Sequence, residues 1–180
     1  MRRIILVSFI PISFVLILAA GFAPAQTAPG TNWTKFVSTA GNFTAAFPVN
    51  PQETSETKTF PQGDVVSHMF LAVTNGFLCG VGYTDYPIDL DVEQELALDR
   101  DNFAKEVKAT VSTTQRTTFK RASGDQLPAL EFVAVNDQGT FKGTVVLDHR
   151  RAYLAVTFNL KGADKTADIQ RFFASFTLDK

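Results

Sequence analysis

The sequence predicts an α+β fold, in which a largely antiparallel sheet carries a mid-chain helix and a C-terminal helix. Short apolar or alternating runs separated by turn residues occupy most of the chain, as in a sheet built from hairpins. The segment 92–108 has apolar residues at helical spacing, and Asp91 can cap its start. The tail 163–178 carries four large apolar residues at the i, i+3, i+4, i+7 spacing of one helix face, Ile169, Phe172, Phe173 and Phe176. That face requires a sheet to cover.

The first 25 residues have the features of a secretory signal peptide. Arg2 and Arg3 give a positive start, an apolar run follows from Ile4 to Ala20, and Ala23–Ala25 forms an A-x-A cleavage site. An uncleaved anchor helix is the alternative, but it needs about 20 apolar residues and usually lacks a small-residue exit. We therefore expect a periplasmic or secreted bacterial protein that has no membrane segment after cleavage.

The mature chain is expected to be weakly acidic. Loss of the two arginines lowers the Lys and Arg count from 17 to 15, against 18 Asp and Glu, so the net charge is near -3. This balance argues against a nucleic-acid partner. A composition of 45% hydrophobic and 19% charged residues is that of a globular protein. We expect one domain at 33–180, after a flexible leader at 26–32.

The first half of the domain reads as two hairpins with a polar strand between them. Two aromatic runs, 33–37 and 43–47, form the first, and 53–60 is a polar strand. The strands 65–74 and 77–86 flank Asn75-Gly76, which predicts a type I′ turn because both residues tolerate positive φ. Both of these strands are apolar on both alternating faces, so we expect them near the centre of the sheet.

The predicted helix at 92–108 contains one anomaly. Asp99 falls in the apolar stripe formed by Val92, Leu96, Phe103 and Val107. Either the helix is interrupted near Asp99, or the carboxylate finds a partner at the sheet edge.

Four strands follow the helix. The polar segment 110–121 suits an edge strand, because its threonines and charges discourage further pairing. The strands 128–135, 140–148 and 152–160 come next. The face of 140–148 that holds Phe141, Val145 and Leu147 is the more apolar one, and the tail helix is expected on it.

Cys79 and His68 are the first candidates for chemistry, because an imidazole beside a thiol can produce a nucleophilic thiolate. However, Cys79 lies mid-strand among apolar neighbours, where a free cysteine behaves as a small buried hydrophobe. His68 on the neighbouring strand is better explained as a hydrogen-bonded sheet residue. We expect no catalytic residue here.

A small anion-binding patch is the second hypothesis. His149, Arg150 and Arg151 form a basic turn, with Lys120 and Arg121 possible neighbours in space, and arginine presents a planar fork to carboxylate or phosphate. A solvated hairpin turn explains the same residues.

No metal or cofactor site is predicted. An acidic group around Pro87 could attract a hard cation, but it lacks the loop spacing of calcium motifs and also suits a helix start: Asp85, Asp89, Asp91 and Glu93. Two histidines and one cysteine cannot assemble a zinc set, and the phosphate- and dinucleotide-binding glycine motifs are missing from the sequence. Gly80-Val81-Gly82 is best explained as a bulge or a close-packing site within a strand.

Several spread-out features resemble the PsbP-like superfamily. These features are an aromatic hairpin ending in Phe-Pro (43–48), a Pro-x-x-Glu strand start (128–131), an Ala-Tyr-Leu strand (152–154) and a closing Phe-Phe-x-Ser-Phe (172–176). The superfamily includes a photosystem II extrinsic protein, a Ran-binding nuclear import factor and many secreted bacterial proteins. The resemblance implies an α/β/α sandwich with a largely antiparallel sheet, and it implies binding or assembly rather than catalysis.

The expected function is therefore that of an exported, non-catalytic module for an unknown protein or small-molecule partner. The alternative is a ligand carrier, or a hydrolase or isomerase, with a pocket between helix and sheet.

Overall fold

A computed structural model describes residues 33–179 of the chain. The predicted signal peptide at 1–25 and leader at 26–32 lie outside the described residues, so both stay predictions. Among the described residues, no helix has the length and hydropathy needed to cross a membrane.

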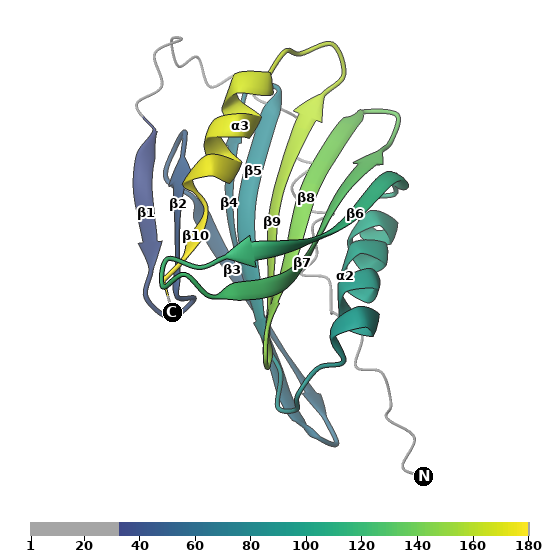
Figure 1. Ribbon diagram of the computed structural model, residues 1–180. Helices are drawn as coiled ribbons and strands as arrows, with labels where there is room; N and C mark the ends of the chain where they lie inside the picture. The colour runs from purple at the N-terminus through teal and green to yellow at the C-terminus, as the bar shows by residue number, and fades with distance from the viewer. Residues whose placement is uncertain (1–32, 180) are drawn as a thin grey trace.

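The centre of the molecule is a seven-stranded sheet in which all neighbouring strands are antiparallel (Figure 1). In spatial order the strands are β3 (Gln52–Phe60), β4 (Gly63–Thr74), β5 (Phe77–Asp85), β9 (Arg151–Leu160), β8 (Gly139–Asp148), β7 (Gln126–Val135) and β6 (Thr110–Lys120). The two edges are the polar strands β3 and β6. The edge position of β6 is the one that the sequence predicts. Threonines and charges on both edges discourage pairing with another chain.

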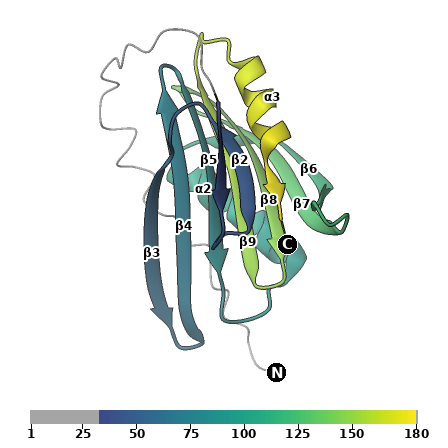
Figure 2. The same cartoon turned by 90° about the vertical axis from the view of Figure 1, so that its left-hand side faces the viewer.

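The two faces of this sheet are covered differently (Figure 2). One face packs against α2 (Val92–Glu106). The other packs against α3 (Thr166–Ser175) and a three-stranded sheet of β1 (Thr34–Ser38), β2 (Phe43–Phe47) and β10 (Thr177–Leu178). The predicted α+β fold with helices on both faces is confirmed, and one outer layer also contains strands.

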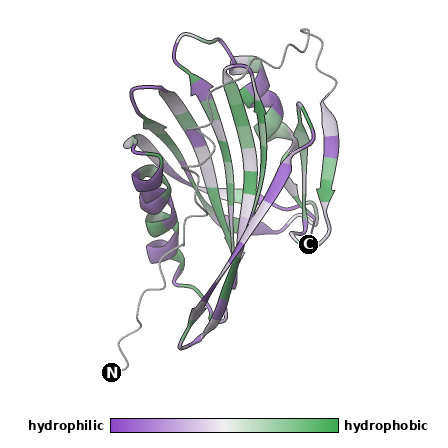
Figure 3. Ribbon diagram, turned by 180° about the vertical axis from the view of Figure 1, so that it is seen from behind, coloured by the Kyte–Doolittle hydropathy of each residue, from purple (hydrophilic) through white to green (hydrophobic). Residues whose placement is uncertain are grey.

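Side-chain alternation along the strands produces two separate cores. In β4, Met69 and Leu71 face the α2 side, whereas Phe70 and Ala72 face the side of α3 and the small sheet. In Figure 3 many residues of the central strands are hydrophobic, whereas α2 carries many hydrophilic residues. The prediction that β4 and β5 are covered on both faces is confirmed.

The expected position of the tail helix was wrong. Phe141, Val145 and Leu147 of β8 belong to the α2 core, where Phe103 packs between Phe132 and Phe141 at centroid distances of 5.6 and 5.5 Å. The helix α3 lies on the opposite face of the sheet. The more apolar face of β8 packs against α2, whereas only Val146 of β8 belongs to the core on the α3 side. Polarity along one strand therefore does not say which of two helices covers a face.

The tail is also less helical than its apolar spacing predicts. Helix α3 ends at Ser175, and Phe176 is extended with φ -75° and ψ 119°. Strand β10 follows and pairs with β2 through Thr177↔Thr44 and Leu178↔Phe43. The Ser175 hydroxyl fixes this exit, because Oγ accepts from Ala46 N at 2.8 Å and donates to Phe172 O at 2.7 Å.

Two local predictions need correction. The Asn75-Gly76 hairpin exists, but only Gly76 has positive φ (72°), so its turn is not type I′. Helix α2 is continuous through Asp99, and this buried carboxyl lies beside Glu95 of the same helix rather than at a sheet edge.

Of the two readings of Gly80 and Gly82, close packing is the one that holds, because β5 pairs with β4 here without a bulge. A Cβ at Gly80 would lie 2.4 Å from the Leu71 side chain, and one at Gly82 would lie 2.8 Å from Met69.

Candidate functional site

The basic turn lies at one end of the large sheet, where Asp148 pairs with Arg151 to close the β8–β9 hairpin. His149 takes the left-handed conformation with φ 54°, which a two-residue hairpin loop commonly requires. Its side chain is 91% exposed. The turn therefore presents His149 and Arg150 outward from a short, well-defined loop.

Arg151 fastens this end of the molecule. Its guanidinium donates to both carboxylate oxygens of Asp85, with Nε–Oδ1 at 2.5 Å and Nη2–Oδ2 at 2.8 Å. Nη1 donates to Ala40 O in the β1–β2 turn at 2.9 Å, and the group lies 4.7 Å from the Tyr83 ring centroid. Because its guanidinium binds Asp85 of the large sheet on one side and Ala40 of the β1–β2 turn on the other, Arg151 joins the large sheet to the small one.

Arg150 is held more loosely. Its Nε donates to Asp89 Oδ1 at 2.8 Å, and the two side chains are 60% and 78% exposed. The hydrogen bond from Arg150 lowers the pKa of Asp89 below its ordinary value. An ion pair this exposed contributes little to stability, so it can open for another anion at small cost.

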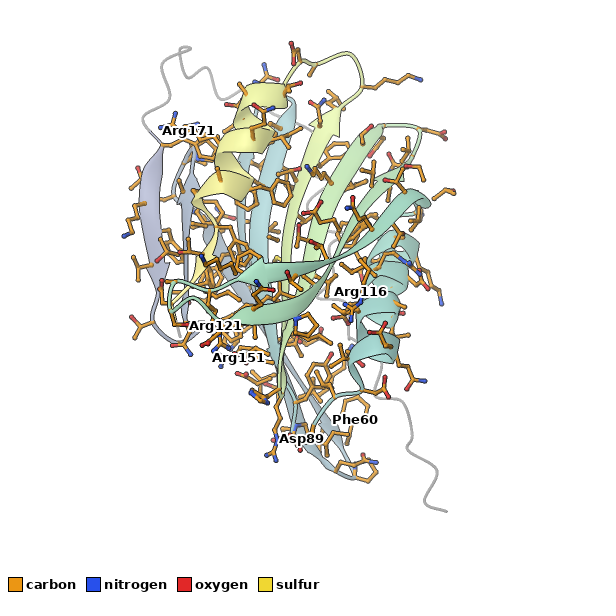
Figure 4. The ribbon with its side chains drawn as sticks, viewed as in Figure 1. Phe60, Asp89, Arg116, Arg121, Arg151 and Arg171 are labelled. Atoms are coloured by element: carbon orange, nitrogen blue, oxygen red, sulfur yellow. The ribbon has the colours of Figure 1, made fainter. Side chains whose placement is uncertain are left out.

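Arg121 also approaches the turn, as the sequence hypothesis required (Figure 4). It forms an ion pair with Asp148, and both side chains are mostly buried. Each of Arg121, Arg150 and Arg151 thus holds a carboxylate already. An incoming anion could reach Arg150 and His149, whereas binding at Arg151 would require breaking the enclosed pair with Asp85. The anion-binding role of His149, Arg150 and Arg151 stays a prediction.

His68 lies on the sheet surface beside this end. Its ring stacks on Tyr83 at a centroid distance of 4.7 Å, and Nδ1 lies 3.0 Å from Glu53 Oε1. The histidine is therefore partnered within the sheet.

Cys79 is too far from His68 to act with it. Cys79 pairs with Ala72, four residues along β4 from His68, which separates the two by about 13 Å. The thiol is completely buried, and burial raises its pKa. Both features suit a structural cysteine.

The acidic residues around Pro87 do not converge on one point. Asp85 binds Arg151, Asp89 binds Arg150, and Asp91 caps α2 by accepting from Gln94 N at 3.0 Å. Across residues 33–179, no group of three or more potential metal ligands is found.

Sequence reasoning missed the partners of the key side chains. Nothing local in the sequence connects Arg151 to Asp85 or Tyr83, because these residues lie on strands paired only in the fold. A second omission, Glu95 beside Asp99, had a visible signal. The i, i+4 spacing puts both carboxyls on one side of the helix.

Comparison with solved structures shows which known fold the chain has. The solution structure of cyanobacterial PsbP (CyanoP) from Synechocystis sp. PCC 6803 matches 88% of this chain and 98% of its own, with a TM-score of 0.52 and 13% identity. The chain has a PsbP-like fold. At this identity the likeness shows the fold alone.

A second match is weaker and carries no argument. A crystal structure from Bacteroides thetaiotaomicron covers 82% of this chain and 49% of its own, with a TM-score of 0.36 and 11% identity. No protein-family model matches the sequence, and no curated protein matches it significantly.

Proposed function

We propose that this PsbP-like protein is an exported accessory module without catalytic activity, which binds an acidic segment of a partner protein through the β8–β9 turn. The observation that carries the proposal is the turn itself. His149 and Arg150 are exposed at its tip, and the bidentate Arg151–Asp85 pair fixes its base. A rigid base with an exposed cationic tip suits recognition of carboxylates.

The chemistry of the described residues favours binding over catalysis. Cys79 is buried and distant from His68, and His68 is engaged with Glu53 and Tyr83. A nucleophile needs an accessible position beside a base, and neither residue has that arrangement.

The alternative of a carrier or enzyme with a pocket between helix and sheet is disfavoured by how those spaces are filled. Phe103 of α2 packs against Phe132 and Phe141, and Phe172 of α3 packs against Phe47. Phe172 is completely buried. Aromatic side chains thus occupy the positions in which a ligand would lie.

Competitive recovery of a partner tests the proposal. The mature protein is immobilised and exposed to periplasmic extract or culture medium of the source bacterium, in parallel with a His149→Ala/Arg150→Ala variant. Lys161→Ala is the matched control, because Lys161 is an exposed cation in the β9–α3 connection at the opposite strand end.

We expect the double variant to recover at least about tenfold less of a specific partner, which corresponds to roughly 1.4 kcal/mol of binding free energy. The Lys161→Ala protein should recover as much as wild type. If all three proteins recover the same amount of partner, the binding interface does not include the β8–β9 turn.

A further inference from the structure

The first half of α2 buries two carboxyl groups beside a tyrosine. Glu95 is 6% exposed, Asp99 2%, and Tyr86 in the β5–α2 connection 5%. Glu95 lies between the other two and is close enough to interact with both. Neither Asp99 oxygen, nor Glu95 Oε1, nor the Tyr86 hydroxyl has a hydrogen-bond partner of good geometry. Four polar atoms are therefore buried close together, and each lacks a well-formed hydrogen bond.

The two arginines near the first half of α2 are engaged elsewhere, and Lys105 and Lys108 are exposed at its far end. Arg116 of β6 donates to Glu93 at 2.5 Å, and Arg100 donates to Asp101 and Thr114. In the 86–91 connection, Asp89 binds Arg150 and Asp91 caps the helix. None of these interactions supplies a positive charge to the buried pair.

The other surroundings of the pair do not supply a charge either. Strands β7 and β8 present apolar side chains to α2: Leu130, Phe132, Ala134, Phe141, Val145 and Leu147. Ser67 of β4 and Thr84 of β5 are bonded to each other through their hydroxyls at 2.9 Å, and neither titrates near neutral pH. Further along α2, Glu106 is acidic as well.

Protons are the species that this pair can accommodate. An ionised carboxylate is costly to bury without a partner, and two adjacent ones repel each other. Burial raises the pKa of Asp99, with Glu95 acting in the same direction, and burial also raises the pKa of Glu95. A metal ion would require more ligands, and no third carboxylate, His or Cys among residues 33–179 completes a site.

We propose that the first half of α2 is a proton-sensitive latch, which packs on the sheet while Glu95 and Asp99 hold protons and loosens when they ionise. The latch is connected to the β8–β9 turn at two points. Tyr86 N donates to Arg150 O at 2.9 Å, and the Arg150 side chain holds Asp89. When the start of α2 loosens, these two contacts transmit the change to the β8–β9 turn. The latch is measurable without any partner and does not depend on the proposed function.

The direction of the effect follows from proton linkage. In the packed state the two carboxyls have raised pKa values, so above about pH 4 this state holds more protons than the loosened one. Stability of the packed state is complete below the ordinary carboxyl pKa. It then falls with rising pH, by up to about tenfold in the packing equilibrium per pH unit and per proton, until the raised pKa values are passed.

Hydrogen exchange of the mature protein between pH 4.5 and 8 tests the latch. Protection factors, corrected for the intrinsic pH dependence of exchange, are measured for amides 92–106 and compared with those of β5 and β9. In wild type we expect α2 protection to fall at least about tenfold relative to these strands across the range.

Neutral variants identify the groups responsible. Asp99→Asn should flatten the α2 profile, and Glu95→Gln provides a second test if the first variant folds poorly. Asp101→Asn is the matched control, because Asp101 is an exposed acid on the same helix, and its profile should follow wild type.

Three outcomes would overturn the latch. One is a wild-type α2 profile parallel to that of β5 and β9. Another is an unchanged pH slope in both Asp99→Asn and Glu95→Gln. The third is a Ca²⁺ effect: millimolar Ca²⁺ at pH 8 restores the protection of α2 in the wild-type protein but not in Asp99→Asn. That result would mean that Glu95 and Asp99 bind a metal ion.

Discussion

At the scale of single residues, Arg151 shows why a basic turn is not by itself a binding patch. The turn contains three consecutive cationic or titratable residues, yet Arg151 is engaged by Asp85, Ala40 and Tyr83. Its neighbour Arg150 has one exposed carboxylate partner. Adjacent arginines therefore differ in their surroundings: Arg151 is enclosed by three contacts, and Arg150 is exposed in a single ion pair.

Replacing each arginine by lysine should show this difference. Arg151→Lys keeps the charge but loses the planar fork, so we expect a loss of about 1–2 kcal/mol in the free energy of unfolding. Arg150→Lys should change it by less than about 0.5 kcal/mol, because its ion pair is exposed. Urea denaturation at neutral pH measures both, and equal effects would contradict a structural role for Arg151.

Cys79 should be inert in the native protein. Its thiol is completely buried, and burial raises its pKa, so both access and thiolate formation are suppressed. We expect labelling by a thiol reagent to require unfolding, and its rate to rise steeply across the denaturant transition. Stoichiometric labelling within seconds under native conditions would make Cys79 a reactive thiol.

At the scale of elements, the tail demonstrates the limit of helical spacing. Its four apolar residues have the pattern of one buried helix face, but Phe172 is completely buried, while Ile169 and Phe173 are only partly buried. Phe176 is buried from an extended position outside the helix. The pairing of β10 with β2 follows the end of the helix at Ser175, one residue before the last apolar position of the pattern. The spacing of apolar residues along the chain does not show that a distant strand will pair with the end of the tail in place of a further helical turn.

The two adjacent phenylalanines of α3 should differ in their contribution to stability. Phe172→Ala should cost about 3–5 kcal/mol, because it empties a fully packed position. Phe173→Ala should cost less than half as much, since part of that ring is exposed and Lys142 lies over it at 5.3 Å from the centroid. Chemical denaturation of the two variants gives the comparison. Equal losses would mean that the Phe173 ring is as well packed as that of Phe172.

At the scale of the whole molecule, strand positions were largely predictable and layer assignment was not. Edge character was visible in the polar composition of β3 and β6, because unpaired strand edges favour threonine and charge. The face taken by each helix depends on chain connections and on which side chains fit together. Phe103 fits between Phe132 and Phe141, and this selects the face for α2.

Export is a prediction for the full-length chain. Mass spectrometry of the protein recovered from its source organism should find Gln26 at the N-terminus, since Ala23–Ala25 matches a signal-peptidase site. Fractionation should place this species in the periplasm or medium. If the protein is bound to the membrane with Met1 intact, the segment is an uncleaved membrane anchor and not a signal peptide.

The sequence by itself determined the order of the strands and helices along the chain, the polar edges and the burial of Cys79, because these follow from local spacing and composition. Only the tertiary structure decided which face each helix covers, which carboxylate each arginine holds, and how Asp99 is buried beside Glu95 and Tyr86. Those outcomes depend on residues far apart in the chain, and the free energies that select among them arise only when the layers pack together.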